Sequence, residues 1–131
     1  MSKRQLKLLV RLPEYQYPRN AWRVAIHKAV KEKMKETNVC YIAEDKLELI
    51  IRLYFDKTKL QFVDIDNRVK DIMDALQGHV GGAGKKQRLL KPIIPNDSQI
   101  YRVIAEKGLP PKQSHGLGHL IIRKYKKQNF L

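Results

Sequence analysis

Four stretches of the chain alternate apolar and polar residues with a period of two, which is typical of β-strands that bury one face. The clearest stretch is 47–55. Its apolar face consists of Leu47, Leu49, Ile51, Leu53 and Phe55. Three further strands are predicted at 5–12, where Pro13 ends the alternation, at 98–107 and at 118–125.

Two other stretches repeat apolar residues at helical spacing. The first runs from Trp22 to Val30 and predicts a helix capped by Asn20, with Trp22 more consistent with a core anchor than with a platform for a base. The second carries Val69, Ile72, Met73 and Leu76 and ends at Gly78. Two amphipathic helices are therefore expected, each with one buried stripe.

Residues 61–66 precede the second helix and alternate again, so they predict a short strand leading into it. In an extended chain Asp64 and Asp66 would point to the same side, and Val63 and Ile65 to the other. Asp66 or Asn67 would then cap the helix. Lys70, one turn further on and off the apolar stripe, would stand beside both carboxylates.

The order of these elements predicts an α/β (α+β) fold of one domain, residues 1–131. We expect a small mixed sheet of four or five strands with two helices covering one face. Residues 78–95 lack periodicity and contain glycines and lysines, which predicts a long flexible loop with a functional role.

The charge is strongly positive and unevenly distributed. The formal net charge is +14: residues 1–39 hold ten Lys or Arg against three acids, 40–77 six against eight, and 78–131 eleven against two. So large an excess favours an anionic partner, with nucleic acid first, although a lysine-rich surface also serves solubility. The one net-negative segment is the one that contains Asp64 and Asp66.

The single cysteine, Cys40, can form no disulfide within the chain, which fits a reducing compartment. It is expected to be a small buried apolar residue rather than a nucleophile. No apolar run is long enough for a membrane span or a signal peptide, so a cytoplasmic protein is expected.

Asp66 alone could be an ordinary helix cap, but two carboxylates on one side repel each other unless a cation lies between them. Carboxylate oxygens suit Mg²⁺, or Mn²⁺ as a substitute, which commonly keeps its other positions for water and substrate phosphate. With Lys70 as a nearby positive charge, the pattern indicates metal-dependent phosphodiester chemistry.

Three parts of the sequence form one pattern: Asp64-Ile65-Asp66-Asn67 with Lys70, the later Asp74-Ala75-Leu76, and the downstream run Asn96-Asp97-Ser98-Gln99-Ile100. This pattern resembles that of the RusA family of Holliday junction resolvases. The resemblance implies a homodimeric, Mg²⁺-dependent endodeoxyribonuclease that cuts four-way DNA junctions in recombination and repair. It implies that Asp64, Asp66 and Asp97 bind the metal and that Lys70 is catalytic. The chain has Asn96 where the family often has a second acid, and its segment between Gln77 and Asn96 is longer.

Six basic residues are the expected DNA contacts: Arg19, Arg68, Lys85, Lys86, Arg88 and Lys91. Two alternatives remain open at the level of sequence. One is a metal nuclease for other branched DNA, and the other is a non-catalytic basic nucleic-acid-binding protein. For a dimer interface, the candidates are Leu9, Ile50 and Tyr54 on the less regular strand faces.

Overall fold

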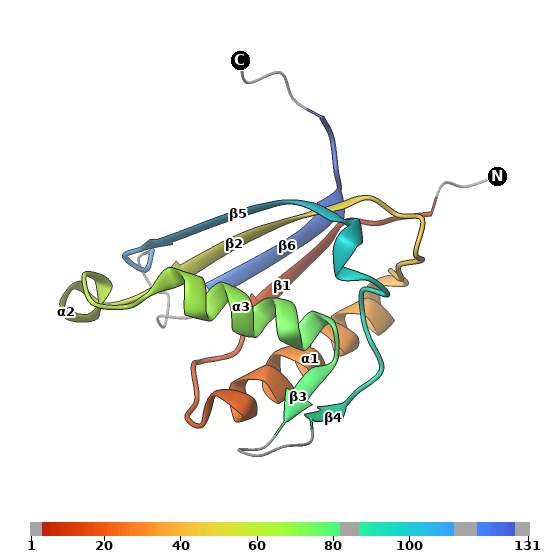
Figure 1. Cartoon of the computed structure of the whole chain (residues 1–131). Helices are drawn as coiled ribbons and strands as arrows, with labels where there is room; N and C mark the ends of the chain where they lie inside the picture. The colour runs from red at the N-terminus through yellow and green to blue at the C-terminus, as the bar shows by residue number, and fades with distance from the viewer. Residues whose placement is uncertain (1–3, 82–86, 112–117, 128–131) are drawn as a thin grey trace.

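The computed structural model describes residues 4–81, 87–111 and 118–127 and has a mixed α and β architecture, as expected (Figure 1). The elements in chain order are β1 (Leu8–Leu12), α1 (Arg19–Thr37), β2 (Leu47–Tyr54), α2 (Lys57–Leu60), α3 (Ile65–Leu76), β3 (His79–Gly81), β4 (Gln87–Leu89), the 3₁₀ turn η1 (Asp97–Gln99), β5 (Ile100–Gly108) and β6 (Gly118–Lys124). Among the described helices, none is both long and apolar enough to cross a bilayer.

The main sheet has four strands in the order β1-β6-β2-β5. β2 runs parallel to β5, whereas β6 is antiparallel to both β1 and β2, so the predicted mixed sheet is confirmed. β2 is the strand with the strongest alternation in the sequence, and it lies at the centre, hydrogen-bonded on both sides.

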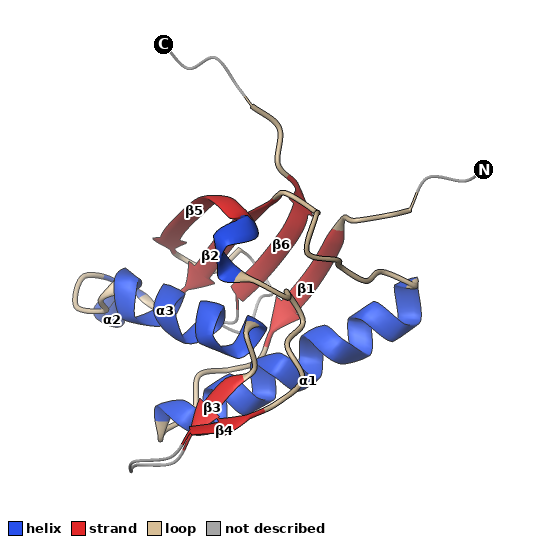
Figure 2. Ribbon diagram, turned by 45° about the vertical axis from the view of Figure 1, so that its right-hand side comes forward, coloured by secondary structure: helices blue, strands red, loops and turns tan. Residues whose placement is uncertain are grey.

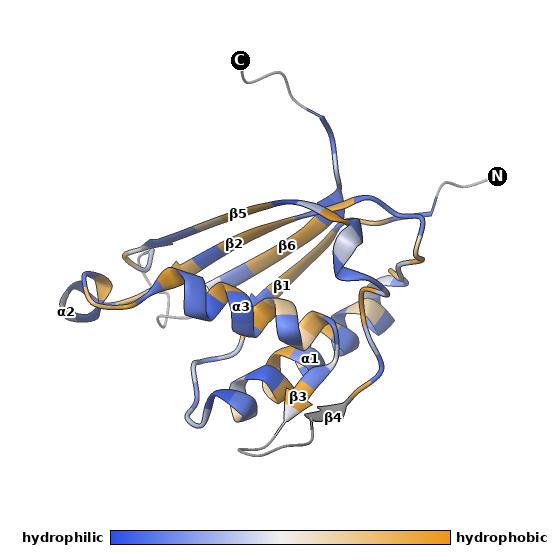
Figure 3. Cartoon of the chain, viewed as in Figure 1, coloured by the Kyte–Doolittle hydropathy of each residue, from blue (hydrophilic) through white to orange (hydrophobic). Residues whose placement is uncertain are grey.

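Both long helices cover the same face of this sheet (Figure 2). Leu8, Val10 and Leu12 of β1 are buried on that face, and the intervening Leu9 is exposed on the other. Hydrophobic residues mix with hydrophilic ones along the strands of the sheet and along α1 and α3 (Figure 3). The helix stripes predicted from sequence supply the other half of the core, with Trp22, Ile26, Ile72 and Leu76 almost fully buried.

The uncovered face of the sheet, here called the open face, carries an apolar row across all four strands. The register pairs Leu9 with Ile121, Ile121 with Ile50, and Ile50 with Ile104. Leu9 is 51 % exposed and Ile104 43 %. This face therefore presents one continuous line of aliphatic side chains to solvent.

A buried ion-pair cluster lies beside that row. Glu48 of β2 is 1 % exposed and accepts hydrogen bonds from Arg102 on β5, at 2.9 Å, and from Arg123 on β6. Burial raises the pKa of Glu48, but the hydrogen bond and charge of Arg123, with Arg102, outweigh it and hold that pKa below its usual range. The cluster ties the three strands together.

The strand predicted at 61–66 is wrong. Asp56 caps the short helix α2 through a hydrogen bond from the Lys59 backbone N–H, a turn follows, and α3 already begins at Ile65. Phe62, in the turn between the two helices, is 77 % exposed. The six residues alternate as in a strand, but no described strand pairs with them, so turn and helical hydrogen bonds form instead.

The long loop predicted at 78–95 is also wrong in part. Gly78 ends α3, as expected, with φ of +75°, and a Cβ there would lie 2.1 Å from the carbonyl oxygen of Leu90. β3 and β4 then pair as an antiparallel two-stranded sheet. The chain returns along α3, where the backbone N–H groups of Ile93 and Ile94 bond to the carbonyl of Leu76 and both side chains are buried.

Two smaller predictions are corrected as well. Pro18, not Asn20, occupies the N-cap of α1, and the Asn20 side chain accepts a hydrogen bond from the Gly81 backbone instead. Cys40 is exposed rather than buried. Trp22 is the core anchor that its position predicted, 2 % exposed and bonded through its indole N–H to the Pro13 carbonyl.

Candidate functional site

The sequence motif meets the downstream acid in one groove of about 490 Å³, here called the α3 groove. Its lining residues are Ile65, Asp66, Val69, Lys70, Met73, Asp74, Gln77, His79 and Asp97. Three of the four predicted catalytic residues, Asp66, Lys70 and Asp97, are therefore brought together, although Asp97 is distant in the chain.

Helical periodicity explains the position of the first two. Asp66 lies in the first turn of α3, where a carboxylate is favoured by the helix dipole, and its Oδ1 accepts a hydrogen bond from the Asn67 backbone at 3.0 Å. Lys70 follows one turn later on the same side. Both side chains are exposed, and the half-buried Val69 and Met73 form the apolar part of the wall.

Asp97 is held by a well-anchored turn rather than by a strand. Asn96 and Gln99 form a reciprocal capping box around η1, immediately before β5 begins. The Gln99 side chain is buried and donates to the carbonyls of Ile42 and Asp45, at 2.8 Å each. The backbone under Asp97 is thus fixed to the loop that precedes β2.

That loop is itself fastened by an ion pair. Both guanidinium nitrogens Nη1 and Nη2 of Arg4 donate to the Asp45 carboxylate, at 2.9 and 2.6 Å. The hydrogen bonds from Arg4 hold the pKa of Asp45 below its usual range, against the effect of burial. A charge at the start of the chain therefore supports the turn that presents Asp97.

Asp64 lies outside the lining of the α3 groove. It occupies the exposed N-cap position of α3, and its side chain makes no capping hydrogen bond. Because the chain is not a strand here, Asp64 and Asp66 do not share the strand face that the sequence predicted. Across the described residues, no three His, Cys, Asp or Glu side chains are grouped to hold a metal ion.

The groove nevertheless has a donor set that fits one kind of metal. Asp66 and Asp97 offer two carboxylates, and the neighbouring space is large enough for water and a phosphate. Mg²⁺ commonly takes one or two protein carboxylates and completes its octahedron with water and substrate oxygen, unlike zinc, which prefers a closed set of nitrogen and sulfur ligands. The set therefore suits Mg²⁺ or Mn²⁺.

Sequence reasoning gave no role to two residues of the groove, Asp74 and His79. Asp74 follows Lys70 by one turn, and its carboxylate lies 3.5 Å from Arg23 of α1. His79 is exposed on β3. Asp74 could have been found from its i+4 spacing to Lys70, whereas His79 depends on the hairpin that the sequence did not reveal.

Asp71 has a structural role that the sequence also left unassigned. It is fully buried between α1 and α3, and its carboxylate accepts three hydrogen bonds from Arg19 and one from Arg23. These bonds fix the helix that carries Asp66 and Lys70 against α1. Arg19, predicted as a DNA contact, therefore has a structural partner, and its DNA contact remains a prediction.

The other predicted DNA contacts lie in different environments. Arg68 stacks on the Tyr15 ring, 3.5 Å from its centroid, and its buried Nε has no hydrogen-bond partner among the described residues. Lys91 is exposed. Lys85 and Lys86 lie outside the described residues, and for Arg88 only the backbone, in β4, is described.

Comparison with protein-family models, with curated proteins and with solved structures yields no significant match.

Proposed function

We propose that this chain is a cytoplasmic, Mg²⁺-dependent endodeoxyribonuclease that resolves four-way DNA junctions. The observation that carries the proposal is the meeting of Asp66, Lys70 and Asp97 in the α3 groove, in a chain with a net charge of +14. Two carboxylates and an ammonium around a phosphate-sized space suit hydrolysis of a phosphodiester. The resemblance of the motif to the RusA family supplies the substrate class.

In this proposal Asp66 and Asp97 hold the metal, and Asp64 would join them only by reorienting from the N-cap of α3. The bound metal would supply Lewis-acid stabilisation of the phosphate and a more acidic water. Lys70 adds a fixed positive charge where negative charge increases during attack. The ion pairs of Asp71 hold α3, which carries Asp66 and Lys70, against α1.

DNA binding would come from the basic segments on both sides of the acidic centre. Arg68, Lys91 and the lysines between β3 and β4 are candidates for contacts with phosphate. Such contacts predict an affinity that falls steeply with salt.

We further propose that the working form is a homodimer formed through the open face. A four-way junction has two-fold symmetry, and one chain carries one motif. A closed two-fold dimer would place identical sites on the two strands to be cut. The row Leu9–Ile121–Ile50–Ile104 supports this part of the proposal, because it is continuous and half exposed. Leu9 and Ile50 were candidates from sequence.

The dimer is tested by sedimentation of the variant Leu9→Glu/Ile104→Glu. Both side chains are substantially exposed, so the monomer should fold, but two charges in the apolar row should oppose association. The wild type should sediment at about twice its 15.4 kDa mass and the variant as a monomer. Ile42→Glu, at another exposed site, is the control and should stay dimeric. A wild-type monomer that makes paired cuts would contradict the proposal.

A non-catalytic basic DNA-binding protein is the second candidate, favoured by the lack of a ready three-ligand metal cluster in the described part of the chain. Incubation with a labelled synthetic four-way junction, in Mg²⁺ and in EDTA, separates the two. The proposal expects symmetrical nicks on opposing strands in Mg²⁺ alone. Binding without cutting in both buffers favours the second candidate, and equal cutting of flaps and junctions indicates a broader nuclease.

A further inference from the structure

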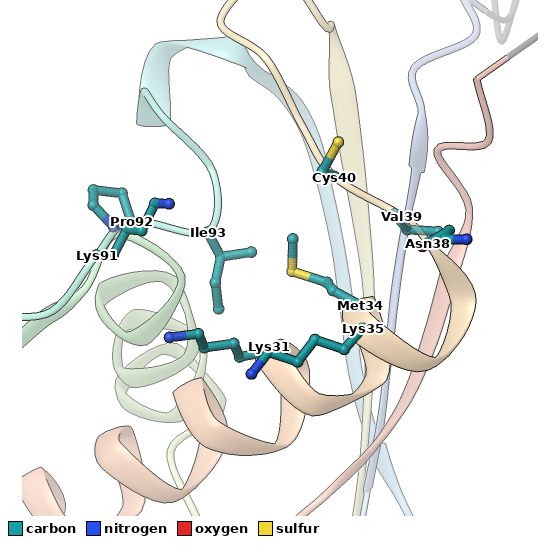
Figure 4. A pocket seen from close by; sticks show the side chains of 9 residues that line it. All are labelled: Lys31, Met34, Lys35, Asn38, Val39, Cys40, Lys91, Pro92 and Ile93. Carbon is teal, nitrogen blue, oxygen red and sulfur yellow. The ribbon is translucent and has the colours of Figure 1, made fainter.

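A second cavity, here called the α1 pocket, lies at the C-terminal end of α1, with a volume of about 310 Å³ (Figure 4). Its lining residues are Lys31, Met34, Lys35, Asn38, Val39, Cys40, Lys91, Pro92 and Ile93. One wall is the last turns of α1 and its exit, and the other is the segment that leads from β4 towards η1. No residue of the pocket belongs to the lining of the α3 groove.

Both walls are fixed by hydrogen bonds. His27 of α1 is buried, and its Nε2 donates to the Lys91 carbonyl at 2.8 Å. The Ile93 N–H donates to Leu76 of α3 at 2.9 Å. The helix wall ends in Asn38, which adopts the left-handed conformation and closes α1 on the Met34 carbonyl. The pocket is thus a preformed feature of the fold, and a ligand need not order either wall to bind there.

The pocket is apolar inside and positive at its edge. Val39 and Ile93 are nearly buried and Met34 is half-buried, so the interior is aliphatic and thioether surface. Lys31, Lys35 and Lys91 are exposed around it, no lining residue is acidic, and none of these three lysines has an ion-pair partner among the described side chains. The helix dipole accounts for a cation in the last turn, at Lys35, but not for Lys91, which comes from another segment.

This combination favours a peptide over a nucleic acid. Unstacked bases bind proteins largely by stacking on aromatic rings, and no described residue that lines the α1 pocket is aromatic. A phosphate backbone alone would meet the lysines and leave the apolar interior unfilled. An apolar side chain followed or preceded by carboxylates would fill the interior and pair with all three lysines.

We propose that the α1 pocket binds an acidic peptide segment of a partner protein, with one bulky apolar side chain in the interior and acidic residues on Lys31, Lys35 and Lys91. Such a contact would bring the protein to a partner while the α3 groove stays free. The inference does not depend on the proposed nuclease activity, because it uses no residue that lines the α3 groove; Lys91 alone is also a candidate phosphate contact of that proposal.

The test uses a fluorescein-labelled peptide in which a run of aspartates precedes leucine and phenylalanine. Fluorescence anisotropy should show saturable binding to the wild type. Replacing the two apolar residues of the peptide by alanine should weaken binding. Lys31→Glu reverses a charge at the edge of the pocket and should weaken binding by about tenfold. Lys57→Glu, on exposed α2, changes the net charge equally and should leave the affinity near that of the wild type.

A second variant separates the apolar contact from charge. Met34→Gln keeps nearly the same shape and adds a polar group, so it should also weaken binding of the peptide. If Lys31→Glu and Lys57→Glu weaken binding equally, or if the alanine peptide binds as well as the parent, the attraction is only general charge and the proposal is wrong.

Cys40 reports occupancy directly, because it is exposed, lines the pocket and is the only cysteine of the chain. Saturating peptide should slow the reaction of Cys40 with a thiol reagent, and the alanine peptide should not. Protection of Cys40 by single-stranded or duplex DNA, without protection by the peptide, would show a nucleic-acid site and overturn the proposal. An unchanged rate at saturating peptide would place the peptide elsewhere and also overturn it.

Discussion

Replacing Asp71 by Asn should destabilise the protein strongly, although the two side chains have nearly the same shape. The Asp71 carboxylate is fully buried, and its Oδ1 lies 2.9 Å from Arg19 Nη2 and 3.0 Å from Arg23 Nη2. Asn removes the negative charge and leaves two guanidinium groups facing an uncharged amide. Removing one member of a buried pair costs roughly 3–5 kcal/mol.

The lower end of that range is expected here. The Arg19 side chain is 42 % exposed, so water can solvate its charge after the substitution, and the amide oxygen of Asn can still accept one hydrogen bond. We therefore expect a loss of about 3 kcal/mol. With a urea m-value of about 2 kcal/mol/M, the unfolding midpoint should fall by about 1.5 M.

Asp74→Asn is the matched control, since it makes the same chemical change on the same helix. Asp74 is 28 % exposed and has one ion-pair contact, at 3.5 Å to the shared Arg23. Its loss should cost less than about 1 kcal/mol, or about 0.5 M in urea midpoint. Equal midpoint shifts for the two variants, or an unchanged midpoint for Asp71→Asn, would refute the view that this buried carboxylate holds α3 against α1.

Three further predictions concern the turn after α3, the acid limit of stability and the groove. Gly78→Ala should lower the free energy of unfolding by at least about 1–2 kcal/mol in urea melts, because φ is +75° and a carbonyl oxygen blocks the Cβ. The lowered pKa of Asp45 means that its stabilising contribution is complete above an ordinary carboxyl pKa of about 3.9 and is lost as pH falls through the lower folded value. Arg4→Gln should therefore reduce the loss of stability on acidification, measured by melts between neutral and strongly acidic pH, and an unchanged loss would contradict this. Lys70→Ala should reduce single-turnover junction cleavage by about a hundredfold while changing stability by within about 0.5 kcal/mol, and a near-native rate would exclude Lys70 from catalysis.

Regular elements were predictable from sequence because their patterns are long and agree with burial. β2 alternates over its whole length, and α3 repeats apolar residues at helical spacing up to Gly78, whose lack of a side chain allows the turn. These signals are local. They reflect the same burial that stabilises the fold, so they gave the four strands of the main sheet and the two helices on one of its faces.

The errors arose where the outcome depends on distant partners. The alternation at 61–66 suits a strand, but a strand needs hydrogen-bonded neighbours, and β2 already pairs with β5 and β6. Ile93 and Ile94, between two prolines, gave no periodic signal, yet they pack on α3 because the hairpin returns the chain there. No sequence pattern showed that Asp71 faces two arginines.

The site was predictable in part for the same reason. Asp66 and Lys70 are one helical turn apart, so their proximity follows from local geometry. Asp97 reaches the groove from a turn that the capping box and the buried Gln99 fix to the loop before β2, and no local pattern predicts that contact. Asp64 was expected beside Asp66 on a strand, and the early start of α3 places it outside the groove instead.

The central claim is that the carboxylates of Asp66 and Asp97 serve cleavage and not DNA binding. The most direct measurement compares single-turnover cutting and binding of the same four-way junction by the variants Asp66→Asn and Asp97→Asn. The charge-matched control is Glu44→Gln, at an exposed site outside the α3 groove. Both groove variants should lose Mg²⁺-dependent cutting by at least about a hundredfold and keep wild-type affinity for the junction, while the control keeps both. Near-native cutting by either variant, or a loss of binding equal to the loss of cutting, would contradict the claim.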